Sequence, residues 1–204
     1  MPSDLTRRGA LGLALRAALA AALPGLARAL TAATAERLVR DLVDDINAVI
    51  NSGKSEGAMY RDFERIFQRY ADVPTVARFT LGADARRASP AQLRAYTDAY
   101  STWIARSYGS RFREFIGGRL EVQETRAIPR SNRTDYEVRT VAFLRGEDPF
   151  EVSFLVSDAS GRPKFYNAFI EGVNMLLSER TEIGAMLDRR GGDIDALIRD
   201  IGGN

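Results

Sequence analysis

Residues 117–172 read GGRLEVQETRAIPRSNRTDYEVRTVAFLRGEDPFEVSFLVSDASGRPKFYNAFIEG. Apolar and polar residues alternate along this stretch, as in Leu120 and Val122 against Glu121 and Gln123. Alternation with a period of two is typical of a half-buried strand. Four such runs follow one another, at residues 120–123, 136–140, 150–156 and 164–170. The connections between them are short and rich in turn residues, so we predict an antiparallel meander.

On both sides of this stretch the apolar residues recur at steps of three and four, the period of amphipathic helices. Helices are predicted at residues 36–51, 59–70, 72–81, 89–108, 176–190 and 193–201. Asp72, Ser89 and Asp193 are suitable capping residues, and Ser89 with Gln92 forms a capping box. We therefore predict one α+β domain in which helices pack over one face of a curved antiparallel sheet.

Large side chains gather in one segment. Of the chain's 10 Phe, 7 Tyr and 1 Trp, 11 lie between Tyr60 and Phe115. An aromatic stripe at helical spacing is more often an ordinary core than a ligand pocket, so both interpretations stay open at this point.

The composition excludes several kinds of site. The 204 residues include no Cys and no His, which removes disulfides, zinc–thiolate sites and histidine triads. Neither a metal nor a cofactor is expected, and any catalysis would rest on Asp, Glu, Lys, Tyr or Ser. The 29 basic residues are scattered among 27 acidic ones, so we expect no nucleic-acid partner.

Residues 1–29 have the pattern of a cleavable export signal. The adjacent Arg7 and Arg8 precede a weakly apolar Ala/Leu stretch, and Ala27-Arg28-Ala29 is a small-x-small cleavage signal. The paired arginines favour the twin-arginine type, and the alternative is an Ala-rich helix that stays attached. The net charge of the whole chain is +2, and residues 1–29 alone carry a net charge of +3. The domain at residues 30–204 therefore has a net charge of −1.

Several motifs occur in an order that resembles a known family. They are Leu81-Gly82, Ser89-Pro90-Ala91-Gln92, Ile170-Glu171-Gly172-Val173, Arg180 and Asp193-Ile194-Asp195-Ala196-Leu197-Ile198. Together they are similar to the MlaC, or toluene-tolerance, family of periplasmic phospholipid-binding proteins. The segment Pro163-Lys164-Phe165-Tyr166-Asn167 departs from the family, which has tryptophan at the first of these positions and aspartate at the last.

The resemblance implies an NTF2-like or cystatin-like shell that encloses an apolar pocket for the acyl chains of a phospholipid. It also implies a periplasmic carrier, not an enzyme, that maintains outer-membrane lipid asymmetry. The implied partners are an outer-membrane lipoprotein complex and an inner-membrane ABC transporter with an MCE-domain subunit. The residues expected to line the pocket are Phe63, Phe67, Tyr70, Tyr96, Tyr100, Trp103, Ile104, Val138, Phe154, Val156, Phe169 and Val173.

Two other functions remain open. An enzyme on the same fold would use Asp and Tyr for acid–base chemistry on a small apolar substrate. Its candidate acids are Asp44, Asp45, Asp62, Asp72 and Glu171, with Asp72 beside Tyr70 as the most suggestive pair. An adaptor that binds only proteins would need a filled core where a carrier needs a cavity.

Overall fold

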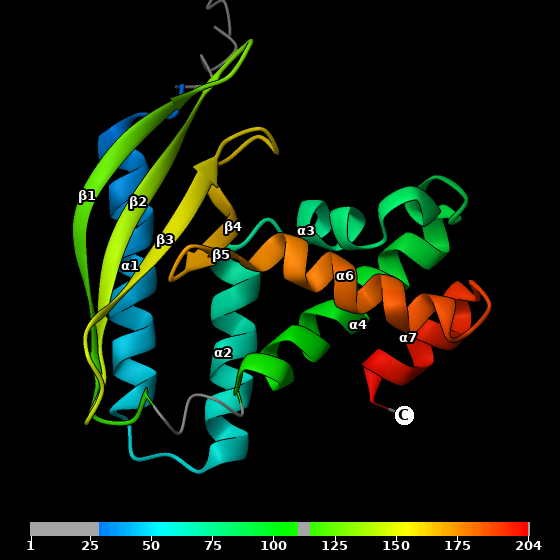
Figure 1. Cartoon of the computed structure of the whole chain (residues 1–204), viewed down its shortest axis with the longest axis horizontal. Helices are drawn as coiled ribbons and strands as arrows, with labels where there is room; N and C mark the ends of the chain where they lie inside the picture. Colours follow the sequence, from blue (N-terminus) through cyan, green and yellow to red (C-terminus); the bar gives the residue numbers. More distant parts are fainter. Residues whose placement is uncertain (1–28, 110–114, 204) are drawn as a thin grey trace, which may run out of the picture.

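The structure, a computed structural model, describes residues 29–109 and 115–203, so the predicted export signal lies outside it except for Ala29. The described residues form six α-helices, one 3-10 helix and five strands (Figure 1). In chain order these are α1 (Ala32–Ile50), α2 (Glu56–Tyr70), α3 (Val73–Thr80), η1 (Gly82–Arg86), α4 (Pro90–Gly109), β1 (Arg119–Pro129), β2 (Thr134–Phe143), β3 (Phe150–Ser157), β4 (Lys164–Ile170), β5 (Val173–Asn174), α6 (Met175–Asp188) and α7 (Ile194–Gly202). Within the described helices, no segment combines the length and the hydropathy that a membrane span requires.

The strands form one sheet in the order β1-β2-β3-β4-β5, and each neighbouring pair is antiparallel. The predicted meander is therefore confirmed. The register shifts between Val122 and Glu124 in β1 and between Leu155 and Val156 in β3. Such irregularities bend strands and increase their twist, in agreement with the curved sheet in Figure 1.

The predicted helix caps are confirmed. A side-chain oxygen of Asp72 accepts from the Thr75 backbone N–H, and Asp193 Oδ1 accepts from two N–H groups in the first turn of α7. The Ser89 hydroxyl accepts from the Gln92 N–H at 3.1 Å, while Gln92 Oε1 accepts from the Ser89 N–H at 3.0 Å. These contacts satisfy N–H groups that have no partner within the helix. The structure differs from prediction in starting α1 earlier and in adding η1 after α3.

Glu171 and Gly172 form a tight turn after β4. Both have positive φ, 49° and 79°, which a type I′ turn requires of its two central residues. The turn joins β4 to β5, a fifth strand that the sequence did not predict. Asn174 then caps α6 by accepting from the Leu177 N–H.

The buried apolar residues form two separate clusters. The first, called here the sheet cluster, joins α1 and α2 to one face of the sheet and includes Leu42 and Val138. The second, the helical cluster, lies among α3, α4, α6 and α7 and includes Tyr96 and Leu197. Figure 1 shows α1 lying along the sheet while α4, α6 and α7 extend away from it. The predicted α+β architecture, with helices over one face of the sheet, is confirmed.

Candidate functional site

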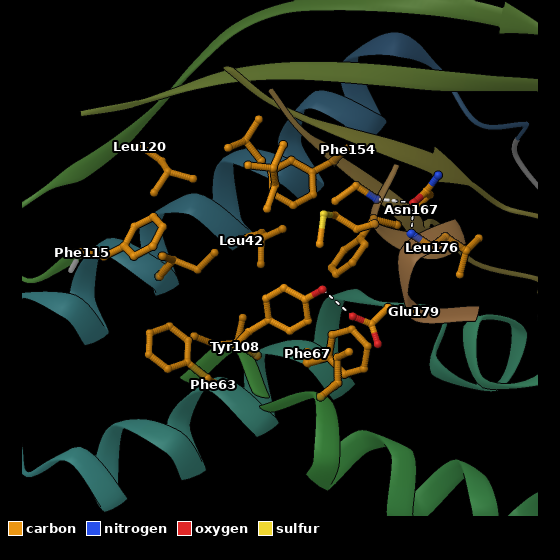
Figure 2. A pocket seen from close by; sticks show the side chains of 18 of the residues that line it. Leu42, Phe63, Phe67, Tyr108, Phe115, Leu120, Phe154, Asn167, Leu176 and Glu179 are labelled. Carbon is orange, nitrogen blue, oxygen red and sulfur yellow. Dashed lines mark hydrogen bonds between the residues drawn. The ribbon is translucent and has the colours of Figure 1, made fainter. Parts of the chain in front are cut away.

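A cavity of about 640 Å³ lies where the two clusters face each other (Figure 2). Residues of the sheet cluster, such as Leu42 and Phe154, form one wall, and residues of the helical cluster, such as Val76 and Ile104, form another. The apolar lining consists of Leu42, Ile46, Phe63, Ile66, Phe67, Val76, Ile104, Ala105, Phe115, Leu120, Leu144, Phe150, Val152, Phe154, Phe165, Ala168, Ile170, Met175 and Leu176. A concave site of this size with a mainly apolar lining is typical of a site for an apolar ligand.

Edge-to-face contacts between rings hold the aromatic part of the wall. The Phe165 ring packs against Phe67 at a centroid distance of 6.1 Å and against Phe154 at 5.6 Å. Phe115 and Phe150 pack in the same way at 6.4 Å. This is a preferred geometry for aromatic pairs, so the rings support one another in the wall of the cavity.

The charged residues of the lining are all acidic. Glu147, Asp148 and Glu171 line the cavity and are exposed to solvent, whereas Glu179 lines it and is buried. The exposed residues lie on the β2–β3 connection and the β4–β5 turn, so the cavity opens to solvent there. Among the described lining residues there is no Lys or Arg. The described part of the lining therefore offers no counter-charge to an anionic group inside the cavity.

Glu179 is the unusual polar residue of the site. It is 6% exposed, and the Tyr108 hydroxyl donates a hydrogen bond to its Oε1 (Figure 2). Its Oε2 has no hydrogen-bond partner within residues 29–109 and 115–203. Burial raises the pKa of this carboxyl to about 7; the hydrogen bond from Tyr108 opposes the rise, and the charge of Glu182 adds to it. Glu179 therefore exchanges its proton near neutral pH.

Four of the predicted pocket residues line the cavity: Phe63, Phe67, Ile104 and Phe154. The other eight lie elsewhere. The sheet cluster buries three of them, Tyr70, Val138 and Val156. The helical cluster buries Tyr96 and Tyr100, and Trp103 packs against it. The last two are more accessible, since Phe169 is half-buried and Val173 is 55% exposed.

The local geometry explains this division. The centre of the Tyr100 ring lies 5.8 Å from that of Tyr96 and 5.7 Å from that of Trp103. These three rings of α4 therefore pack against one another within the helical cluster. In β4, Ala168 and Ile170 line the cavity, and Phe169 between them points to the other face because side chains alternate along a strand.

Sequence reasoning missed several lining residues for which a signal existed. Phe150 shares a face of β3 with Val152 and Phe154, as the alternation indicates. Glu179 stands three residues after Leu176 and four before Ile183, and is thus an acid on the apolar face of α6. A charged residue in that position is a signal for a functional or specially paired group.

Most of the predicted candidate acids lie away from the cavity. Asp62 pairs with Lys54 at 2.6 Å and with Arg65, and Asp45 accepts a hydrogen bond from the Tyr70 hydroxyl at 2.6 Å. Asp72 caps α3 and Asp44 is exposed. Glu171 alone among the predicted acids lines the cavity.

Comparison with known proteins identifies similar chains. The family model described as "MlaC protein" matches residues 40–202. A solved structure of a phospholipid-binding protein from Ralstonia solanacearum, in complex with a phospholipid, superposes with a TM-score of 0.68 at 20% sequence identity. The match covers 82% of this chain and 94% of that one, so the two folds agree over nearly the whole domain.

Proposed function

Because the chain belongs to the MlaC protein family, we propose that it binds a phospholipid, with the acyl chains in the cavity and the head group at the exposed rim. The observation that carries the proposal is the large apolar cavity between the two clusters. Each methylene that leaves water for such a cavity contributes roughly 0.8 kcal/mol, so acyl chains can be held without a charged anchor. The phospholipid in the similar solved structure supports the same ligand class.

The charges of the lining support this orientation of the lipid. A phosphate inside the cavity would lie near the buried Glu179 with no cation among the described lining residues, whereas at the rim water and salt screen the charges of Glu147, Asp148 and Glu171. The head group therefore stays in solvent.

We further propose that the protein is a periplasmic carrier that moves phospholipid between an outer-membrane lipoprotein complex and an inner-membrane ABC transporter with an MCE-domain subunit. Such a carrier must shield acyl chains from water during transit, and the cavity between the clusters suits this task. The predicted export signal at residues 1–29 supports the location. Intact-mass measurement of protein recovered from the periplasm tests it, with loss of residues 1–29 as the expected result.

The binding proposal is tested on protein purified without added lipid. Organic extraction and mass spectrometry should yield phospholipid in a fixed ratio to protein. After delipidation, the protein should take up phospholipid from vesicles again. A folded, delipidated protein that takes up none would refute the proposal.

An enzyme remains the second candidate function, and the buried pair of Glu179 and Tyr108 is the observation that favours it. A carboxyl with a pKa near 7 can act as an acid or a base at neutral pH. Prolonged incubation of the loaded protein distinguishes the two functions. A carrier leaves the lipid intact, whereas an esterase releases fatty acid and lysophospholipid over many turnovers.

A further inference from the structure

Only one of the two carboxyl oxygens of Glu179, a residue that lines the cavity, has a hydrogen-bond partner among the described residues. Tyr108 engages Oε1, and the buried Oε2 has no partner among the described residues. Buried polar atoms without a partner are unfavourable and uncommon in folded proteins. Because Glu179 lines the cavity, its unpaired oxygen is a candidate contact for a ligand that packs against this side chain.

The surroundings of Glu179 favour its neutral, protonated form when the cavity is filled. No described Lys or Arg forms an ion pair with it, and the neighbouring titratable groups are Tyr96, Tyr100 and Tyr108 from α4 and Glu182 on its own helix. None of these supplies a positive charge. Acyl chains in the cavity would displace water from the carboxyl and disfavour its charge further. A neutral carboxyl whose Oε1 accepts from Tyr108 can present an O–H donor at Oε2.

We propose that Glu179, oriented by Tyr108, is a polar anchor inside the cavity and donates a hydrogen bond from Oε2 to an ester carbonyl of a bound glycerophospholipid. This rests on the proposed function and adds a chemical preference to it. The ester carbonyls stand at the start of the acyl chains, where a lipid with buried chains and a solvated head group places its uncharged acceptors.

The chemistry of the lining argues against a lipid amine as the partner of Glu179. In a phospholipid the amine is joined to the phosphate by a short link. An amine at Glu179 would draw the phosphate into an apolar cavity that offers it no cation among the described lining residues. An ester carbonyl carries no such cost.

Tyr108 is a positioning residue in this arrangement. Its hydroxyl holds Oε1 on the side of the carboxyl that faces Tyr108 and so limits the positions that Oε2 can take at the cavity wall (Figure 2). Tyr100 has an unpartnered hydroxyl too, but its side chain is 0% exposed and does not line the cavity. Tyr100 is therefore not a contact for the ligand.

The test compares two phospholipids with the same chains and head group, one with ester links and one with ether links that lack the carbonyls. Delipidated protein is incubated with vesicles containing both in equal amounts, and the bound lipids are quantified by mass spectrometry. The wild type should enrich the ester lipid roughly five-fold, the effect of one net hydrogen bond. Glu179→Leu should bind as much total lipid as the wild type but show no preference for the ester lipid. Glu179→Gln, which keeps a hydrogen-bond donor, should keep most of the preference.

Two further variants sharpen the test. Tyr108→Phe should reduce the preference because it frees the carboxyl to rotate. Asp188→Asn removes an exposed carboxyl from the end of the same helix and should leave the preference unchanged. Circular dichroism verifies that each variant is folded.

Each other outcome overturns the inference. Equal binding of both lipids by the wild type, or an undiminished preference in Glu179→Leu, removes Glu179 as the anchor. Enrichment of ethanolamine lipids over choline lipids that is lost in Glu179→Gln would indicate an amine contact instead. If neither lipid binds, the proposed function is wrong, and the proposed anchoring role of Glu179 is wrong with it.

Discussion

The stability of the lipid-free protein should fall as the pH rises from 4.5 to 7, and Glu179 should be responsible for one separable part of the fall. In the folded protein, burial raises the pKa of this carboxyl from 4.5 to about 7. Between these values the folded state keeps the proton while the unfolded chain has released it. The folded state therefore binds more protons, and raising the pH favours unfolding.

The size of the effect follows from the two pKa values. Each pH unit within the window changes the unfolding free energy by about 1.4 kcal/mol, so the group costs about 3 kcal/mol in all. Glu179 is 6% exposed, so screening by bulk solvent is small. For a chain of this size, about 3 kcal/mol corresponds to a change in Tm of roughly 6–12 °C.

Urea denaturation of delipidated wild type and Glu179→Gln between pH 4.5 and 8 measures this contribution. Glutamine does not titrate, so its stability relative to the wild type should increase by about 3 kcal/mol from pH 4.5 to 7. Titration of other groups affects both proteins and cancels in the difference. Asp188→Asn, which changes an exposed carboxyl at the end of the same helix, should follow the wild type closely. Parallel pH curves for wild type and Glu179→Gln would refute a buried, proton-exchanging carboxyl.

Three further predictions concern the cavity, a buried carboxylate and the β4–β5 turn. Ala168→Phe places a ring in the cavity and should reduce bound lipid several-fold, whereas Ala95→Phe on the exposed side of α4 should not; vesicle uptake measures both. Burial raises the pKa of the Asp135 carboxyl, but hydrogen bonds from Arg and Ser side chains outweigh this effect, so its pKa lies below 3.8. Asp135→Asn should cost about 2 kcal/mol at pH 7 in urea denaturation, and this cost should shrink as the pH falls below 3.8, because the wild type then loses its charge too. Gly172→Ala, at a φ of 79°, should destabilise by about 1 kcal/mol, while Glu171→Gly at a φ of 49° should not destabilise; thermal melts that rank them the other way would contradict the turn geometry.

Periodicity predicted most of the fold because strands and amphipathic helices leave direct patterns in the sequence. The alternation in β3 and the capping box at Ser89 each correspond to one local structure, and both were confirmed. The β5 strand escaped prediction because a two-residue strand has no period of its own. The turn before β5 is formed by Glu171 and Gly172, and the feature that marks it as a hairpin turn is their positive φ. Backbone angles are visible only in the structure.

The cavity was harder to predict than the fold because a period shows which face is apolar but not what covers it. In α4, Tyr100 and Ile104 are one turn apart on an apolar face, yet Tyr100 is packed among helices and Ile104 lines the cavity. The difference arises where α4 passes from the helical cluster to the boundary with the sheet cluster. That boundary depends on contacts between residues distant in sequence, which spacing along one helix does not encode.

The two clusters also determine which features of a lipid the protein can distinguish. A phospholipid in a bilayer already has its chains out of water, so moving them into an apolar cavity changes their free energy little and discriminates weakly among chains. The head group at the rim lies in water, where screening weakens its interaction with the carboxylates. Under the proposed anchoring, the discriminating contact is the one made out of water, at Glu179, where a hydrogen bond is electrostatically strong. It follows that the protein should distinguish lipids by their chain linkage more than by their head group.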